Sequence, residues 1–159
     1  MSNVLKNKKI AILTANGFEQ VELTEPRDAL LSAGATVHIV SPETDYVQGW
    51  KHYDKADTFP VDMALDSANP GDYDGLVLPG GTVNPDQLRI NDSAISFVIA
   101  FFDAGKPVAA ICHCPWTLVE TGAINGRKVT FWPSLKSDLQ NASGTWVDEA
   151  VVVDKPRPA

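Results

Sequence analysis

The segment 107–119 constrains the fold of this chain more than any other. It opens with an apolar run, residues 108–111, which leaves no polar face and predicts a buried parallel strand. Pro115 then suits the first turn of a helix, where its missing N–H group costs no hydrogen bond. Cys112 therefore falls at the carboxyl end of a strand and just before a helix. The sequence predicts a sharp strand-to-helix turn, a nucleophile elbow, with Cys112 at its tip.

The rest of the chain alternates between strand and helix patterns. Short apolar runs bounded by turn residues predict strands and one hairpin or short excursion: 9–15, 36–41, 46–65 (the excursion), 74–79, 129–131 and a final β stretch, 150–153, within 146–153. Apolar periodicity and end signals predict four helices: 21–33, 93–104 with Asp92 as N-cap, 115–122 and 135–142. This order is typical of a doubly wound, three-layer α/β/α sandwich with a mainly parallel sheet.

Composition restricts the class of protein. A length of 159 residues, 44% of them hydrophobic, suits a single domain over 1–159 with a substantial core. The formal charge of −7 and the lack of a dense Lys/Arg block argue against a nucleic-acid groove. No apolar stretch is long enough to cross a bilayer, and the polar N-terminus has no signal-peptide core, so we expect a cytoplasmic protein. Two cysteines one residue apart are not a disulfide framework.

Three punctuated strand ends fall on the edge of the sheet where such folds bind ligands: Asn16-Gly17, Gly80-Gly81 and Cys112. The helix that follows Cys112 favours a thiolate over a thiol. A nucleophilic thiolate also needs donors for a developing oxyanion. We expect these to be the N–H of Gly81 or Thr82 together with the N–H of His113.

The sequence offers two candidates for the proton partner of Cys112. Glu19 follows the first strand on the same edge and, when protonated, could hydrogen-bond the thiolate, although it could equally cap the next helix. His113 is adjacent to Cys112, and adjacent side chains usually diverge. Trp116 could line the mouth of the pocket. Cys112 could also be a plain buried thiol, and a metal or redox pair with Cys114 is weakly supported, so we expect no metal and no cofactor.

With these segments in place, the chain resembles the ThiJ/PfpI superfamily, in the branch of intracellular cysteine peptidase- and amidase-like proteins. The resemblance covers nearly the whole chain and rests on five motifs: Leu-Thr-Ala-Asn-Gly-Phe-Glu (13–19), Val-Leu-Pro-Gly-Gly (77–81), Gly-Lys-Pro-Val-Ala-Ala-Ile-Cys-His (105–113), Asn-Gly-Arg-Lys (125–128) and Val-Asp-Glu-Ala-Val-Val-Val-Asp (147–154). It implies a flavodoxin-like fold, related to the class I glutamine amidotransferases, and a homodimer or higher homo-oligomer.

The resemblance also implies roles for individual residues. Cys112 matches the family nucleophile, and Glu19 matches the carboxylic acid that hydrogen-bonds it. Gly81 and His113 match the oxyanion donors. Asp86 matches an acidic residue that pairs with His113 of a neighbouring subunit, although the family more often has Glu there.

Two departures from the family pattern stand out. Residues 112–116 read Cys-His-Cys-Pro-Trp, where the usual sequence is Cys-His-Gly-Pro-Gln. Cys114 therefore adds a second thiol, and Trp116 puts a large ring where a polar amide is usual. Relatives also continue past the 151–154 strand into a closing helix, whereas residues 155–159 contain two prolines that exclude a regular helix or strand. We expect altered oligomerisation or reduced stability.

The leading hypothesis is a cytoplasmic stress-response enzyme in which Cys112 attacks an electrophilic carbon of a small carbonyl or peptide-like substrate. The resemblance implies glyoxalase- or deglycase-like chemistry, or peptidase- and amidase-like hydrolysis, and Trp116 favours the smaller substrate. An alternative is a non-enzymatic redox sensor, in which Cys112 is oxidised to a sulfenic or sulfinic acid held by Glu19. Cys114 could act as a resolving thiol only if the turn geometry lets it reach Cys112. A third is a degenerate member that is only a stable fold.

Overall fold

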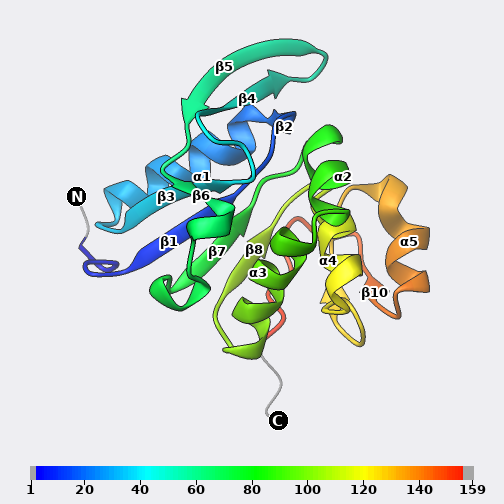
Figure 1. The fold of residues 1–159 in the computed structure, drawn as a ribbon. Helices are drawn as coiled ribbons and strands as arrows, with labels where there is room; N and C mark the ends of the chain where they lie inside the picture. Colours follow the sequence, from blue (N-terminus) through cyan, green and yellow to red (C-terminus); the bar gives the residue numbers. More distant parts are fainter. Residues whose placement is uncertain (1–2, 156–159) are drawn as a thin grey trace.

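A five-stranded parallel sheet forms the centre of the computed structural model, which describes residues 3–155 (Figure 1). The strand order is β6-β3-β1-β7-β8. The strands span Met63–Ala64, Thr36–Ser41, Lys9–Leu13, Gly75–Leu78 and Val108–Ala110 in that order. The central strand β1 pairs in parallel with both β3 and β7, and the outer pairs are parallel too. The predicted parallel α/β sheet is confirmed.

Within residues 3–155, five α-helices connect and cover the strands. They are α1 (Gln20–Ser32), α2 (Val83–Arg89), α3 (Asp92–Asp103), α4 (Pro115–Thr121) and α5 (Lys136–Asn141), with 3-10 turns at Leu65–Ser67, Pro70–Asp72 and Pro133–Leu135. Four of these were expected at nearly these positions, whereas α2 was not. The cap of α3 is also different from the prediction: the side chain of Asn91, not Asp92, accepts the N–H of Ala94 at 2.9 Å.

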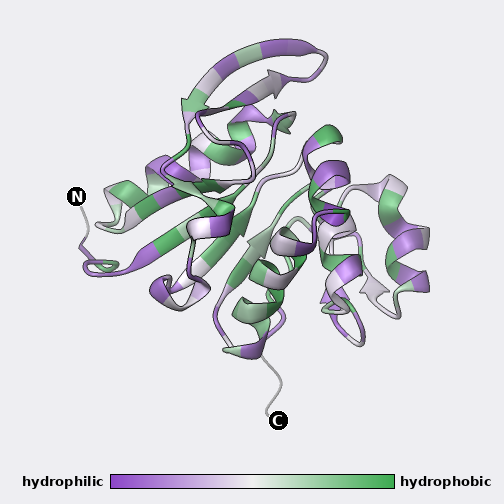
Figure 2. Cartoon of the chain, viewed as in Figure 1, coloured by the Kyte–Doolittle hydropathy of each residue, from purple (hydrophilic) through white to green (hydrophobic). Residues whose placement is uncertain are grey.

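Alternating side chains of the sheet build two cores. Ala11 and Leu13 of β1 face one way, into a cluster with α3 and α4, while Ile12 faces the other way, toward Leu23 of α1. Figure 2 shows the corresponding hydrophobic colouring along β7, β8 and α3. Because helices cover both faces of the sheet, the three-layer architecture is confirmed.

The predicted excursion at 46–65 is a β-hairpin. Strands β4 (Tyr46–Lys51) and β5 (Asp54–Pro60) pair antiparallel, and the short strand β2 (Phe18–Glu19) joins β4 in parallel. The hairpin lies above α1 in Figure 1. It therefore extends the layer that covers the α1 face of the sheet.

Strand β8 is an edge strand and is not fully buried, so the expectation of a buried strand at 108–111 is wrong. Within the described residues, β7 is its only partner in the sheet. Val108 and Ala110 pack on the core, whereas Ala109 and Ile111 are exposed. An edge strand covered on one face has this two-residue alternation, which a run of small apolar residues conceals in the sequence.

The C-terminal part holds less strand than predicted. Strands β9 (Lys128–Val129) and β10 (Thr145–Trp146) form a short parallel pair, but residues 147–155 are in no strand, contrary to the prediction for 146–153. Side chains hold this segment instead: Lys128 contacts Glu149 at 2.9 Å. The two prolines that led us to predict no regular helix or strand over 155–159 lie outside the described residues.

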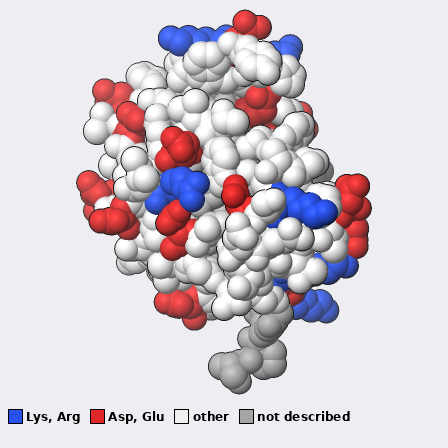
Figure 3. Space-filling model, turned by 90° about the vertical axis from the view of Figure 1, so that its right-hand side faces the viewer, with Lys and Arg blue, Asp and Glu red and all other residues white. Residues whose placement is uncertain are grey.

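The surface carries both signs of charge, with 20 acidic and 13 basic residues in the whole chain. On the face drawn in Figure 3, the two signs are interspersed and the basic side chains form no continuous area. That face therefore offers no cationic track for a nucleic-acid backbone. Among residues 3–155, no helix has both the length and the apolarity needed to cross a membrane.

Candidate active site

Cys112 lies two residues after the end of β8 and three residues before α4 begins at Pro115. Its backbone is in the left-handed region, with φ +62°. Residues other than glycine rarely adopt this conformation, and where they do so the surrounding structure holds them there. The predicted nucleophile elbow is confirmed, and the turn presents a half-buried thiol at the carboxyl edge of the sheet.

The side chain of His113 turns toward Cys112. Its Nδ1 atom lies 3.1 Å from the Cys112 Sγ atom, although adjacent side chains usually diverge. The left-handed backbone at Cys112 explains the difference, because it breaks the regular alternation of side chains. Burial lowers the pKa of His113, which favours the neutral imidazole. A neutral Nδ1 at this distance can accept the thiol proton.

The carboxyl group next to Cys112 belongs to Glu22, so the prediction that Glu19 makes this contact is wrong. Glu22 Oε2 accepts the N–H of Gly80 at 2.7 Å, and its carboxyl group hydrogen-bonds the Cys112 side chain. Glu19 instead accepts the backbone N–H of His52, at 3.1 Å, in the turn of the hairpin. Glu19 lies at the N-cap of α1, but its side chain does not cap the helix. Glu22, three residues later, lies one helical turn further along and reaches the sheet edge.

Glu22 and Cys112 influence each other's protonation. Burial raises the pKa of Glu22, and burial together with the negative charge of Glu22 raises the pKa of Cys112 to about 12. The negative charge of Glu22 therefore opposes the thiolate that the helix was predicted to favour. The N–H groups of Gly81 and His113 lower the pKa of Cys112, but by less. Because burial raises both pKa values, the pair binds a proton more strongly than the two groups would when exposed to water.

Two glycines let the neighbouring strand end approach Cys112. A Cβ atom on Gly80 would lie 2.7 Å from the Cβ of Cys112, and Gly81 has a φ of +74°. The N–H of Gly81 and that of His113 hydrogen-bond the Cys112 sulfur, as expected for oxyanion donors. Thr82 is exposed at the start of α2, so Gly81 is the better candidate of the two residues considered.

Asn84 holds this edge together, and the sequence analysis did not identify it. It is fully buried, and its Oδ1 atom accepts the N–H of Ala15 at 2.7 Å. Its Nδ2 atom donates to the carbonyls of Pro79 and Gly80 at 2.9 and 3.1 Å. The ends of β1 and β7 are therefore tied through one amide. Asn84 comes three residues after the Gly80-Gly81 strand exit, and nothing in the local sequence indicates its contact with Ala15.

Two tryptophans flank His113. The ring of Trp116 meets the imidazole edge-on at 5.5 Å, and the ring of Trp132 stacks on it at 5.8 Å with an interplanar angle of 29°. The backbone N–H of Trp132 also donates to the carbonyl of Cys112 at 3.2 Å. Trp116 was predicted to lie near the pocket mouth, whereas a contact between Trp132 and His113 was not predicted.

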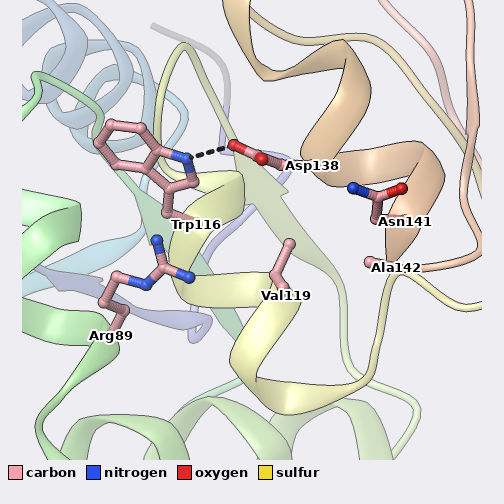
Figure 4. Close-up of a pocket in the computed structure, with 6 residues that line it drawn as sticks. All are labelled: Arg89, Trp116, Val119, Asp138, Asn141 and Ala142. Carbon is pink, nitrogen blue, oxygen red and sulfur yellow. Dashed lines mark hydrogen bonds between the residues drawn. The ribbon is translucent and has the colours of Figure 1, made fainter.

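A surface cavity of about 280 Å³ adjoins the Trp116 side of this site (Figure 4). Its lining consists of Arg89, Trp116, Val119, Asp138, Asn141 and Ala142. In Figure 4 the indole of Trp116 lies between Arg89 and Asp138.

Two other predicted residues lie apart from the thiol–imidazole pair. Asp86 is exposed on α2, and its contact with a neighbouring subunit's histidine stays a prediction. Cys114 is fully buried at the N-cap of α4, and burial raises its pKa. It packs in the main core as a small apolar side chain. Among the residues described, no three or more His, Cys, Asp or Glu side chains are grouped to hold a metal.

Similar proteins have deglycase and stress-protein names. A protein named a deglycase from Pyrococcus horikoshii is 44% identical over 146 residues, which are 92% of this chain and 85% of that protein. Deglycase PfpI from Pyrococcus furiosus is 41% identical over the same shares of the two chains. General stress protein 18 from Bacillus subtilis is 40% identical and is covered over 83% of its length.

Solved structures agree with this relationship. One from Anabaena variabilis, a two-domain protein with DJ-1/ThiJ/PfpI-like and ferritin-like domains, superposes with a TM-score of 0.88 at 32% identity. The match covers 94% of this chain and 42% of that one. A DJ-1 superfamily protein from Salmonella typhimurium gives 0.82 at 28% identity, over 94% of this chain and 78% of the other. The sequence profile of the DJ-1/PfpI family matches residues 8–156, and this chain belongs to that family.

Proposed function

We propose that this protein is a cysteine-dependent enzyme with glyoxalase- or deglycase-like activity toward small 2-oxoaldehydes and their adducts. The observation that carries the proposal is the 3.1 Å contact between Cys112 Sγ and His113 Nδ1 at the tip of the elbow. The deglycase names of relatives at 39–44% identity support the same substrate class. An assembly of copies that brings Asp86 to His113 is part of the proposal, as the family resemblance implies.

The first step is addition of the thiol to the aldehyde. The Cys112 sulfur bonds to the aldehyde carbon, and the carbonyl electron pair moves to oxygen. The thiol proton passes to Nδ1 of His113 and then to that oxygen, which gives a hemithioacetal. The N–H groups of Gly81 and His113 stabilise the negative oxygen while it exists. The thiol proton stays within the site during this step. The step therefore needs no free thiolate, and the high pKa of Cys112 does not prevent it.

The second step is an internal redox change followed by hydrolysis. His113 takes the proton from the former aldehyde carbon and returns it to the neighbouring carbonyl carbon, while the hemithioacetal hydroxyl proton passes to the oxygen of that carbonyl, so the first carbon is oxidised and the second is reduced. The product is a thioester of a 2-hydroxy acid, and no external oxidant is needed. Water then adds to the thioester, the C–S bond breaks, and Cys112 recovers its proton. With methylglyoxal the net reaction adds one water and yields lactate.

The surroundings of the thiol favour a small substrate over a long peptide. Trp116 and Trp132 occupy both sides of His113, and Gly80 and Gly81 bring backbone close to Cys112. A two- or three-carbon carbonyl fits such a site better than an extended chain does. The stress-protein name of the Bacillus subtilis relative agrees with a cytoplasmic detoxifying role.

Redox sensing is less well supported. Peroxide oxidises the thiolate, and the raised pKa of Cys112 keeps the thiolate population small at neutral pH. Cys114 is fully buried and is therefore poorly placed as a resolving thiol.

The test is conversion of methylglyoxal to lactate, with lactate itself measured because any thiol binds methylglyoxal reversibly. We expect Cys112→Ala to abolish lactate formation, and Cys114→Ala to retain most of it. Fluorogenic peptide amides, assayed in parallel, should be hydrolysed far more slowly than methylglyoxal is converted. Full lactate production by Cys112→Ala would overturn the mechanism.

A further inference from the structure

The ring of His113 contacts two tryptophans, and one of them is bound in turn by a residue of another helix. The ring of His113 contacts the indoles of both Trp116 and Trp132, so it has little freedom to rotate while both indoles stay in place. Trp132 is tied to the elbow by its own backbone hydrogen bond to Cys112. Trp116 is on α4, and its backbone alone does not fix the tilt of its ring.

The ring of Trp116 is fixed by charged side chains. Its Nε1–H donates to Oδ2 of Asp138, on α5, at 3.1 Å (Figure 4). The guanidinium of Arg89, on α2, lies over its ring at 5.8 Å. Arg89 is held in turn by Glu120 at 2.6 Å. The hydrogen bond to Asp138 is directional, so it sets the orientation of the indole as well as its location.

We propose that Asp138 is a positioning residue for His113 and acts through Trp116. The proposal rests on the proposed function, since it assigns His113 the role of proton acceptor. When Asp138 holds the indole, the edge-on contact keeps Nδ1 of His113 pointed at the Cys112 sulfur. When that hydrogen bond is lost, Trp116 is free to tilt toward the cavity that it shares with Asn141, and His113 gains rotamers that point Nδ1 away from the thiol.

A purely structural role makes a different prediction. If Asp138 only fastened α5 to α4, its loss would lower stability without changing the turnover of the folded enzyme. A positioning role lowers kcat and leaves KM nearly unchanged, because proton transfer is affected and substrate contacts are not. Asn at position 138 keeps a side-chain oxygen acceptor, so it should restore what Ala removes.

The kinetic experiment compares Asp138→Ala, Asp138→Asn and Asn141→Ala in the lactate assay. Asn141 lines the same cavity from the same helix, but its side chain is not the acceptor for Trp116. We expect kcat to fall by about threefold to tenfold in Asp138→Ala, a fraction of what a positioned base contributes, and to stay near wild type in the other two variants. An equal loss in Asn141→Ala, or a loss that Asn does not rescue, would overturn the proposal.

An NMR experiment gives the same answer without any turnover, so it separates this proposal from the proposed function. The Trp116 indole N–H resonance, assigned with Trp116→Phe, should move upfield in Asp138→Ala as the hydrogen bond is lost. The ring protons of His113 should shift with it, because the ring current of Trp116 changes, and both should return toward wild type in Asp138→Asn. If the His113 resonances stay in place while the indole resonance moves, Asp138 does not position His113.

Discussion

The Sγ atom of Cys112 and the Nδ1 atom of His113, two consecutive residues, lie 3.1 Å apart. Consecutive side chains in a strand point to opposite faces, so this contact exists only because Cys112 leaves the strand in a left-handed conformation, with φ +62°. Nucleophile and proton acceptor are therefore carried on one turn. The third group, Glu22, comes from a helix 90 residues earlier in the sequence and reaches the same sulfur.

Replacement of Glu22 by Gln should make the thiol more reactive. The Glu22 carboxylate raises the pKa of Cys112, so removal of its charge lowers that pKa and enlarges the thiolate fraction at a given pH. Gln also keeps an oxygen for the N–H of Gly80. We expect alkylation by iodoacetamide at pH 8 to be faster by about tenfold for each unit by which the pKa falls.

The control for this experiment is Glu19→Gln, which removes a carboxylate that contacts His52 instead. Its alkylation profile should match that of the wild type across the pH range. If Glu19→Gln shifts the profile and Glu22→Gln does not, the assignment of Glu22 as the partner of Cys112 fails.

Loss of the His113 imidazole should remove the proton acceptor. We expect His113→Ala to lower kcat for lactate formation by about a hundredfold or more, whereas His52→Ala, in the exposed hairpin turn, should have no effect. Burial lowers the pKa of His113, so the imidazole stays neutral to a pH below its usual titration range. The acid limb of kcat/KM in the wild type should therefore lie below pH 6.5, and a limb above that value would contradict this assignment.

The fold and the elbow could be predicted from local patterns, but the identity of the acid could not. A strand followed by Cys112 and then Pro115 specifies a turn through backbone chemistry alone, and the structure has it. Whether Glu19 or Glu22 reaches Cys112 depends on where α1 begins and how it packs. The two residues are three positions apart, and this spacing leaves the Glu19 side chain against the hairpin and the Glu22 side chain at the sheet edge. Sequence spacing places both carboxyls near the strand end and cannot rank them.

The missed features have the same physical origin. The exposure of Ile111 depends on which elements cover each face of the sheet at its edge strand, a tertiary property that the residues of β8 do not encode. Trp132 contacts His113 from a loop 19 residues later in the chain, and Asn84 reaches Ala15 across 69 positions. Both contacts join residues that are far apart in the chain, and the sequence around each residue has no pattern that indicates the contact.

A methyl group at position 80 should damage the site more than one at another glycine. In Gly80→Ala the new Cβ would lie 2.5 Å from Glu22 Oε2, 2.7 Å from the Cβ of Cys112 and 2.8 Å from the carbonyl oxygen of Ile111. We expect a loss of about 1–3 kcal/mol in the free energy of unfolding, with Glu22 displaced and lactate formation lost.

Gly105→Ala is the matched comparison for that variant. Gly105 has a φ of +65°, but no atom lies within 4 Å of a Cβ built there. It should lose about 1 kcal/mol from backbone strain alone and keep full activity. Chemical denaturation and the lactate assay on both variants check the pair, and equal activity losses would show that crowding at Gly80 is not the cause.

Removal of the Asn84 amide should destabilise the sheet edge as a whole. Asn84→Ala leaves the N–H of Ala15 and the carbonyl of Pro79 buried without this partner, and each lost group costs about 1–3 kcal/mol. We therefore expect the free energy of unfolding to fall by about 2–4 kcal/mol in urea denaturation.

Asn91→Ala is the control variant. It removes another asparagine hydrogen bond, the cap of α3, and should lower the free energy of unfolding by only about 1 kcal/mol. Because Asn84 also binds the Gly80 carbonyl next to Cys112, its variant should lose activity at temperatures where it is still folded, whereas Asn91→Ala should not. Equal costs in the two variants would mean that the buried amide does not hold the strand ends together.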